Sequence, residues 1–150
     1  MFTGIVQSKS LKAKLTKKSF GVELSVTVEN GFTKNLKKGD SIAVNGVCLT
    51  VCSFSKKIIK FEIIHESLRL SNLVKNISMP LNLERSLKMG EEIGGHLVSG
   101  HVHCMGKVKE FKKGKEKILT ISKPSLVKDY IFQKGYVCLL YTSPSPRDGW

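Results

Sequence analysis

Short stretches of alternating apolar and polar residues run through the first part of the chain. In residues 22–28, Val22, Leu24, Val26 and Val28 alternate with polar side chains, and residues 11–15 alternate in the same way. Because side chains of a strand point to opposite faces in turn, both stretches are predicted as half-buried strands. Further strands are predicted over residues 1–6, 41–44, 47–54, 58–64 and 81–84, and a short helix or turn over 66–73.

These predicted strands are close together and separated by short turns. Asn45-Gly46 lies between two of them and favours a two-residue hairpin, since both residue types tolerate a positive φ. Six or so strands in under about 90 residues would leave unpaired edges in an open sheet, and closure into a small barrel removes them. The sequence therefore predicts an all-β fold.

An internal repeat extends this barrel pattern along the sequence. An offset of 96 positions aligns residues 3–6 with 99–102 and Lys38-Gly39 with Lys134-Gly135. With one residue removed, residues 24–26 align with 119–121. The common order of these matches predicts two tandem barrels of about 95 residues each, with the second beginning near Leu97.

The repeat fails near the C-terminal end. The strand at 47–51 should recur at 142–146, where Pro144 and Pro146 stand instead. Prolines at alternate positions cannot occupy a central strand, because each removes a ladder donor. We therefore expect a complete barrel over 1–96, a partial second barrel over 97–139 and an anomalous tail over 140–150. Either the second barrel is naturally curtailed or the tail is foreign to the gene or mis-joined, and a foreign or mis-joined tail is the favoured interpretation. The protein would then be truncated at its C-terminal end.

The charge and the cysteines narrow the class of protein. The net charge is +13, yet of the 25 basic residues only Arg69, Arg85 and Arg147 are arginine. Since base and phosphate recognition favours arginine, a solvated lysine surface with no nucleic-acid partner is the preferred interpretation, over contact with anionic small molecules or RNA. The four scattered cysteines indicate a reducing, cytoplasmic location. No apolar run approaches the ~18 residues of a membrane span.

Two clusters carry candidate chemistry. Metal-ligating side chains gather at His96, His101 and His103, with Glu92 nearby. His101 and His103 are predicted to lie on one face of a strand. No fourth ligand has suitable spacing, so no metal site is predicted. Cys48 and Cys52 are also predicted on one strand face, where buried structural thiols are favoured over catalysis.

Several strings together resemble riboflavin synthase of the alpha-chain type, from Met1 to about Leu139. They are Met-Phe-Thr-Gly-Ile-Val at 1–6, Gly-Asp-Ser-Ile-Ala-Val-Asn-Gly-Val-Cys-Leu-Thr-Val at 39–51, Glu-Ser-Leu-Arg-Leu-Ser-Asn-Leu at 66–73, Asn-Leu-Glu-Arg at 82–85 and Glu-Ile-Gly-Gly-His-Leu-Val-Ser-Gly-His at 92–101. The resemblance implies tandem six-stranded Greek-key barrels, the second incomplete here. It also implies a longer full-length protein that forms a homotrimer.

The resemblance also implies a reaction. Two molecules of 6,7-dimethyl-8-ribityllumazine exchange a four-carbon unit, giving riboflavin and 5-amino-6-ribitylaminopyrimidinedione as the last step of riboflavin biosynthesis. No metal or organic cofactor is implied, because the acidic 7-methyl group of the lumazine supplies the carbanion. The full-length protein is expected to be a transferase, and this chain to be inactive alone. The alternative is a non-catalytic lumazine- or flavin-binding protein of the same fold.

Site residues carry over from the family by matching motifs. Ser41, Cys48 and His101 are the expected catalytic positions, His101 because imidazole moves protons near neutral pH. The expected substrate-binding positions are Phe2 at a pocket edge, Gly4, Ile5, Val6, Cys48, Leu49, Thr50, Glu62, Ile63, Ile64, His65, Glu66, Ser67, Gly100, His101, Val102 and Lys134. Glu66 and Ser67 suit ribityl hydroxyls, and residues 100–102 are expected to open the second site. The family's second-site aspartate and serine fall at Leu140 and Ser143, onto which no role is carried.

Overall fold

The computed structural model describes residues 1–75, 77, 80–113, 117–133, 135 and 137–139. Its elements are β1 (Ser8–Lys9), β2 (Lys12–Lys18), β3 (Gly21–Thr27), β4 (Ser41–Val44), β5 (Val47–Phe54), β6 (Ile58–Ile64), α1 (His65–Leu70), β7 (Asn82–Arg85), β8 (Val108–Lys113), β9 (Lys117–Ile121) and the 3-10 helix η1 (Ser125–Tyr130). The fold is mostly β, as the sequence predicts.

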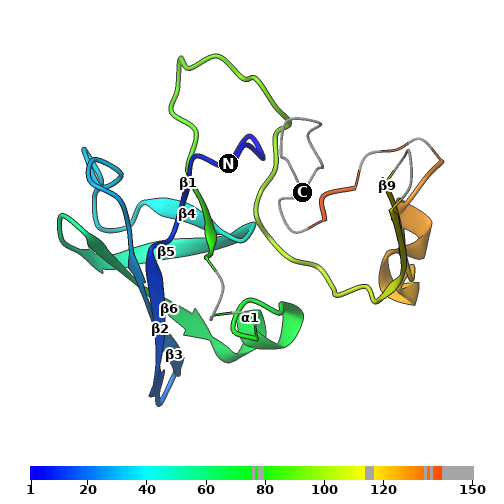
Figure 1. Cartoon of the computed structure of the whole chain (residues 1–150), viewed down its shortest axis with the longest axis horizontal. Helices are drawn as coiled ribbons and strands as arrows, with labels where there is room; N and C mark the ends of the chain where they lie inside the picture. The colour runs from blue at the N-terminus through cyan, green and yellow to red at the C-terminus, as the bar shows by residue number, and fades with distance from the viewer. Residues whose placement is uncertain (76, 78–79, 114–116, 134, 136, 140–150) are drawn as a thin grey trace.

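Seven of these strands form one antiparallel sheet in the order β1-β7-β4-β5-β6-β3-β2. β1 and β2 lie at opposite ends of this order but follow each other in sequence, separated only by Ser10 and Leu11. Ser10 exchanges hydrogen bonds with Leu81, and the Leu11 N–H donates to the Thr27 carbonyl at 2.8 Å. β1 and β2 are therefore two halves of one bent segment, in which β1 pairs with β7 and β2 pairs with β3. This segment joins the two ends of the strand order and curls the sheet into a barrel (Figure 1).

A single hydrophobic core fills this barrel. Alternate residues of each long strand point inward, so the alternation predicted over 22–28 appears directly as burial, and residues 58–64 are buried alternately in the same way. The buried residues are Leu24, Val26, Val28, Leu36, Ile42, Val44, Val47, Leu49, Val51, Ile59, Phe61, Ile63, Leu73, Leu81 and Leu83. The barrel thus uses the inner faces of its strands for stability and leaves the outer faces available for a site.

The predicted hairpin at Asn45-Gly46 is confirmed, with φ of 46° and 81° at the two residues. The predicted strand over residues 1–6 is wrong. Only Phe2 makes a β-bridge there, with Val98, and Gly4 has a φ of +82° that breaks an extended backbone. The strand expected to carry His101 and His103 is also absent, since residues 101–107 have no regular secondary structure.

After β7 the backbone crosses to a second, smaller region. Residues 86–107 form a long connection to β8 and β9, which pair as a separate two-stranded sheet, followed by η1 (Figure 1). Large apolar side chains stay exposed here, among them Leu126, Tyr130 and Phe132. Within the described ranges, no helix is both long and apolar enough to cross a lipid bilayer.

Candidate functional site

The outer face of the β4–β5 hairpin brings together three of the predicted site residues. Ser41 pairs with Thr50, and Ala43 with Cys48. Since directly paired residues of an antiparallel ladder point to the same face, Ser41, Cys48 and Thr50 share one surface. Leu49 points the other way and is 5% exposed, so its side chain belongs to the core and only its backbone can reach this surface.

Two distant segments lie on this surface. Phe2 exchanges backbone hydrogen bonds with Val98 at 2.9 and 3.1 Å, and its ring is fully buried in a small cluster with Ala43, Cys48 and Val98. The family resemblance puts Phe2 at a pocket edge. In the structure the Phe2 ring packs on the hairpin beside Cys48 and supports this surface from inside.

Gly100 packs tightly against the hairpin. The pairing of β5 with β6 does not extend past Val51 toward Cys48. The Cys48 N–H donates instead to the Gly100 carbonyl, at 2.8 Å. A Cβ on Gly100 would lie 2.8 Å from Cys48 Cβ and 3.2 Å from the Phe2 ring, and its φ is +77°. Both the space and the backbone conformation therefore require glycine. His101 follows it at the surface, and Val102 packs partly against the barrel core.

The end of β6 and helix α1 supply the other predicted ligand contacts. Glu62 and Ile64 point outward from β6, whereas Ile63 is 1% exposed and belongs to the core. His65 and Glu66 are exposed and Ser67 is half-buried at the start of α1, which Figure 1 shows beneath the connection after β7. The Glu66–Arg69 ion pair spans 3.9 Å between exposed groups, which leaves the carboxylate accessible to other donors.

Gly4, Ile5 and Val6 occupy a different place, beside β7. The Thr3 N–H and hydroxyl both donate to Glu84 Oε1, at 2.7 and 2.8 Å, and the Ile5 N–H donates to Thr3 Oγ1 at 3.2 Å. Glu84 pairs with Ala43 across the β4–β7 ladder, so this segment lies along the same sheet face as Cys48, two strands away. Lys134 lies outside the described residues.

The arrangement at Gly4 recurs at Gly100. The Ser99 hydroxyl accepts the His101 N–H at 3.2 Å, as the Thr3 hydroxyl accepts that of Ile5, and both central glycines have a φ near +80°. β8 also begins 96 residues after β2. The segments at Gly4 and Gly100 therefore share one local backbone geometry.

Sequence reasoning missed Glu84. It lies in the motif Asn82-Leu83-Glu84-Arg85, which carries no predicted site residue, although Glu84 is 1% exposed and holds the Thr3 segment. The available signal was a carboxylate next to a core leucine on a short strand. A carboxylate in such a position is buried only when it has a specific partner.

Comparison with known proteins places this chain in a class. The sequence matches the family described as lumazine binding domain over residues 3–86, which include the whole barrel. Solved structures of LumP share the fold: the complex with riboflavin has a TM-score of 0.73 at 22% identity, covering 87% of this chain and 72% of that one. The complex with 6,7-dimethyl-8-(1'-D-ribityl) lumazine has a TM-score of 0.69 at 23% identity, covering 83% and 70%.

Curated relatives narrow the class to a family. Riboflavin synthase of Buchnera aphidicola subsp. Baizongia pistaciae is 41% identical over 143 residues, which cover 93% of this chain and 67% of the relative. Riboflavin synthase of Schizosaccharomyces pombe is 38% identical over 157 residues, covering 95% and 70%. The chain belongs to the riboflavin synthase family, and it spans about two thirds of the length of these relatives.

Proposed function

We propose that this chain binds 6,7-dimethyl-8-ribityllumazine and riboflavin on the outer face of the β4–β5 hairpin and serves the riboflavin synthase reaction. The observation that carries the proposal is the convergence of Ser41, Cys48 and Thr50 with the Gly100 segment on one surface. The names of the curated relatives and the ligands of the LumP complexes support the same chemistry.

The residues around this surface have complementary roles in the proposal. The glycine at position 100 lets backbone approach closely, so the planar ring lies against main chain between the Cys48 edge and residues 100–102. Ser41 and Thr50 offer hydroxyls to the ring, and Glu66 and Ser67 accept and donate hydrogen bonds to the ribityl group. The remaining proposed contacts are Glu62, Ile64 and His65. Leu49 and Ile63 would contribute main chain only, because their side chains belong to the core, and the buried Phe2 ring would support the site from inside.

Proton transfer is assigned to His101, with Ser41 and Cys48 as the groups nearest the reacting carbons. His101 is exposed next to Gly100, whose carbonyl is fixed by the Cys48 N–H. In the dismutation a proton leaves the 7-methyl group of one lumazine while a second lumazine accepts the four-carbon unit. The protein contributes orientation and proton transfer, and we propose no metal or organic cofactor.

We also propose that the chain holds a complete first barrel over 1–96 and part of a second over 97–139. The matched hydrogen bonds at Thr3 and Ser99 and the matched hairpins support a duplication. A duplicated barrel offers two similar pockets to two copies of one substrate. Gly4, Ile5 and Val6 would then serve the second site with Lys134. Residues 100–102 are expected from the resemblance to open that second site, but we propose that they serve the first, and the hydrogen bond from the Cys48 N–H to the Gly100 carbonyl supports this.

Assembly and location complete the proposal. A homotrimer would bring barrels of neighbouring subunits together, and a cytoplasmic location fits the cysteine content. Sedimentation of the protein and of a full-length relative would test the trimer. The columns of the second-site aspartate and serine hold Leu140 and Ser143. We therefore expect this chain to bind ligand but to form riboflavin far more slowly than a full-length relative.

The test is a riboflavin fluorescence titration. Binding should quench or shift the riboflavin emission. Thr50→Val should lower the affinity for riboflavin by about tenfold, because the loss of one hydrogen bond costs ~1.4 kcal/mol. Thr16→Val, on the exposed face of β2, is the matched control and should leave the affinity unchanged. An unchanged emission at high micromolar protein would refute the ligand site. Binding together with turnover at the rate of a full-length relative would refute the expected inactivity.

A further inference from the structure

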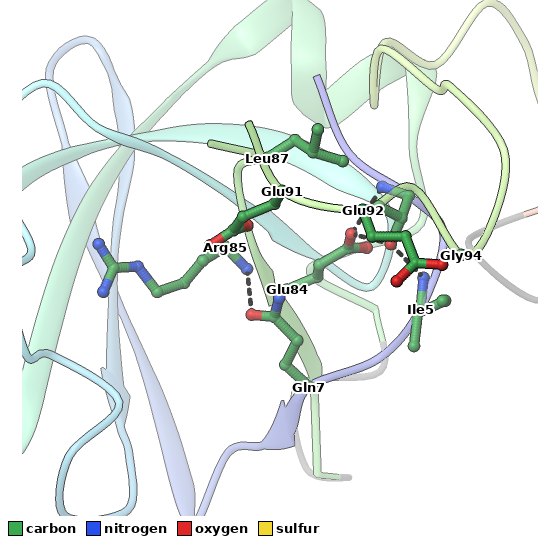
Figure 2. Close-up of a pocket in the computed structure, with 9 residues that line it drawn as sticks. Ile5, Gln7, Glu84, Arg85, Leu87, Glu91, Glu92 and Gly94 are labelled. Atoms are coloured by element: carbon green, nitrogen blue, oxygen red, sulfur yellow. Dashed lines mark hydrogen bonds between the residues drawn. The ribbon is translucent and has the colours of Figure 1, made fainter. Parts of the chain in front are cut away.

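A cavity lies beside the Thr3 segment, two strands away from Cys48 along the sheet. It has a volume of about 180 Å³ and lies between the N-terminal segment, β7 and the loop at 91–94. Ile5 and Leu87 supply apolar wall, and Glu84, Glu91 and Glu92 supply carboxylates, as Figure 2 shows. Of the proposed lumazine contacts that the structure describes, only Ile5 lines it.

Glu84 is the unusual group of this cavity. Oε1 accepts both donors of Thr3, but Oε2 is buried and has no hydrogen-bond partner among the described residues. The residue is 1% exposed and lines the cavity. A buried carboxylate oxygen without a donor costs free energy, so a donor supplied by a bound molecule would stabilise this arrangement.

The neighbouring cations are engaged elsewhere. The Arg85 guanidinium lies 3.6 Å from Asp40 and donates to the carbonyls of Lys34 and Asn35, and Figure 2 shows it pointing away from the cavity. Lys88 pairs with Glu91 at 3.4 Å on the exposed rim. Within the described part of the protein, Glu84 and Glu92 are therefore the carboxylates left to a ligand, although the net charge of the whole sequence is +13.

We propose that this cavity binds a compact alkylammonium group. The ammonium supplies N–H donors to Glu84 Oε2 and to the Glu92 carboxylate, and a short alkyl group lies against Ile5 and Leu87. A bare metal ion fits less well, because the described residues include no group of three or more His, Cys, Asp or Glu placed to hold one. The ammonium comes either from a free amine or from a lysine of a second copy of this protein.

The test is a titration with n-butylammonium chloride followed by the backbone amide resonances of Thr3 and Ile5. Their shifts should saturate in the millimolar range, because the site offers only two charge-assisted contacts, and n-butanol and sodium chloride at equal concentration should produce no saturating shift. Glu92→Gln should weaken binding by about threefold and Glu84→Gln by about tenfold. Glu29→Gln, an exposed carboxylate outside the cavity, is the matched control.

A linear shift up to high salt, an equal response to n-butanol, or unaltered binding in Glu92→Gln would overturn the proposal. If Glu84→Gln loses amide dispersion, Glu92→Gln alone decides. Sedimentation with and without n-butylammonium separates the two sources: an oligomer that the amine dissociates identifies the lysine of a second copy, and an oligomeric state that the amine leaves unchanged identifies a free amine. Riboflavin titration of the same samples keeps failure here distinct from failure of the proposed lumazine site.

Discussion

The β2–β3 and β8–β9 hairpins both pair antiparallel but have very different surroundings. Leu24 of β3 is fully buried, whereas Leu119, which aligns with it in the repeat, is 49% exposed. β3 has β6 on its second edge, while in the described residues β9 pairs with β8 alone. The alternating pattern is therefore enough to form a hairpin. The burial of its apolar side chains, and the stabilisation that this burial gives, depend on neighbouring strands.

The largest expected effect tests this difference directly. Leu24→Ala should lower the free energy of unfolding by about 2–5 kcal/mol, because it removes a buried side chain and leaves a cavity. Leu119→Ala, the matched change at the exposed position, should cost less than about 1 kcal/mol. Urea denaturation followed by circular dichroism measures both. Equal losses would mean that Leu119 is buried in solution and that the two hairpins do not differ.

The two glycine segments give a smaller contrast. Gly4 and Gly100 both have a φ near +80°, so alanine at either position costs about 1 kcal/mol of backbone strain. Only Gly100 also meets Cys48, at 2.8 Å, while a Cβ on Gly4 would have no atom within 4 Å. Gly100→Ala should therefore be the more destabilising by at least ~1 kcal/mol, and it should weaken riboflavin binding as well.

Thermal unfolding and the fluorescence titration measure the two consequences separately. If Gly4→Ala and Gly100→Ala reduced stability equally while leaving riboflavin affinity intact, the contact between Gly100 and Cys48 would have no part in the site.

The hydroxyls that precede these glycines should show the smallest contrast. Thr3→Val removes one of the two donors to the buried Glu84 Oε1 and should cost about 1–2 kcal/mol. Ser99→Ala removes a bond to the exposed His101 N–H and should cost less than about 0.5 kcal/mol. Denaturant titration checks both values, and a larger loss at Ser99 would reverse the comparison.

The barrel was predictable from sequence because its signals are local. The alternation over 22–28, the strand over 58–64 and the positive-φ pair at 45–46 each depend on nearby residues, and each is confirmed. The helix expected over 66–73 forms over His65–Leu70, a shift typical of a short element without a side-chain cap.

The site was only partly predictable because its decisive contacts join residues distant in sequence. The hairpin pattern places Cys48 and Thr50 on one face, but no local signal reveals that the Gly100 carbonyl meets the Cys48 N–H. The strand expected over residues 1–6 fails for the same reason: Glu84 holds Thr3 in a turn at Gly4, which overrides the local pattern.

The bridge between Phe2 and Val98 has a consequence for folding kinetics. Its two residues are almost a hundred positions apart, whereas the β4–β5 turn joins neighbours. Loop-closure entropy grows with length, by ~0.6 kcal/mol per doubling, so this contact forms after the barrel strands have paired. Val98→Ala should then raise the unfolding rate and leave the refolding rate nearly constant. The ligand surface would be the last part of the barrel to assemble and the first to open.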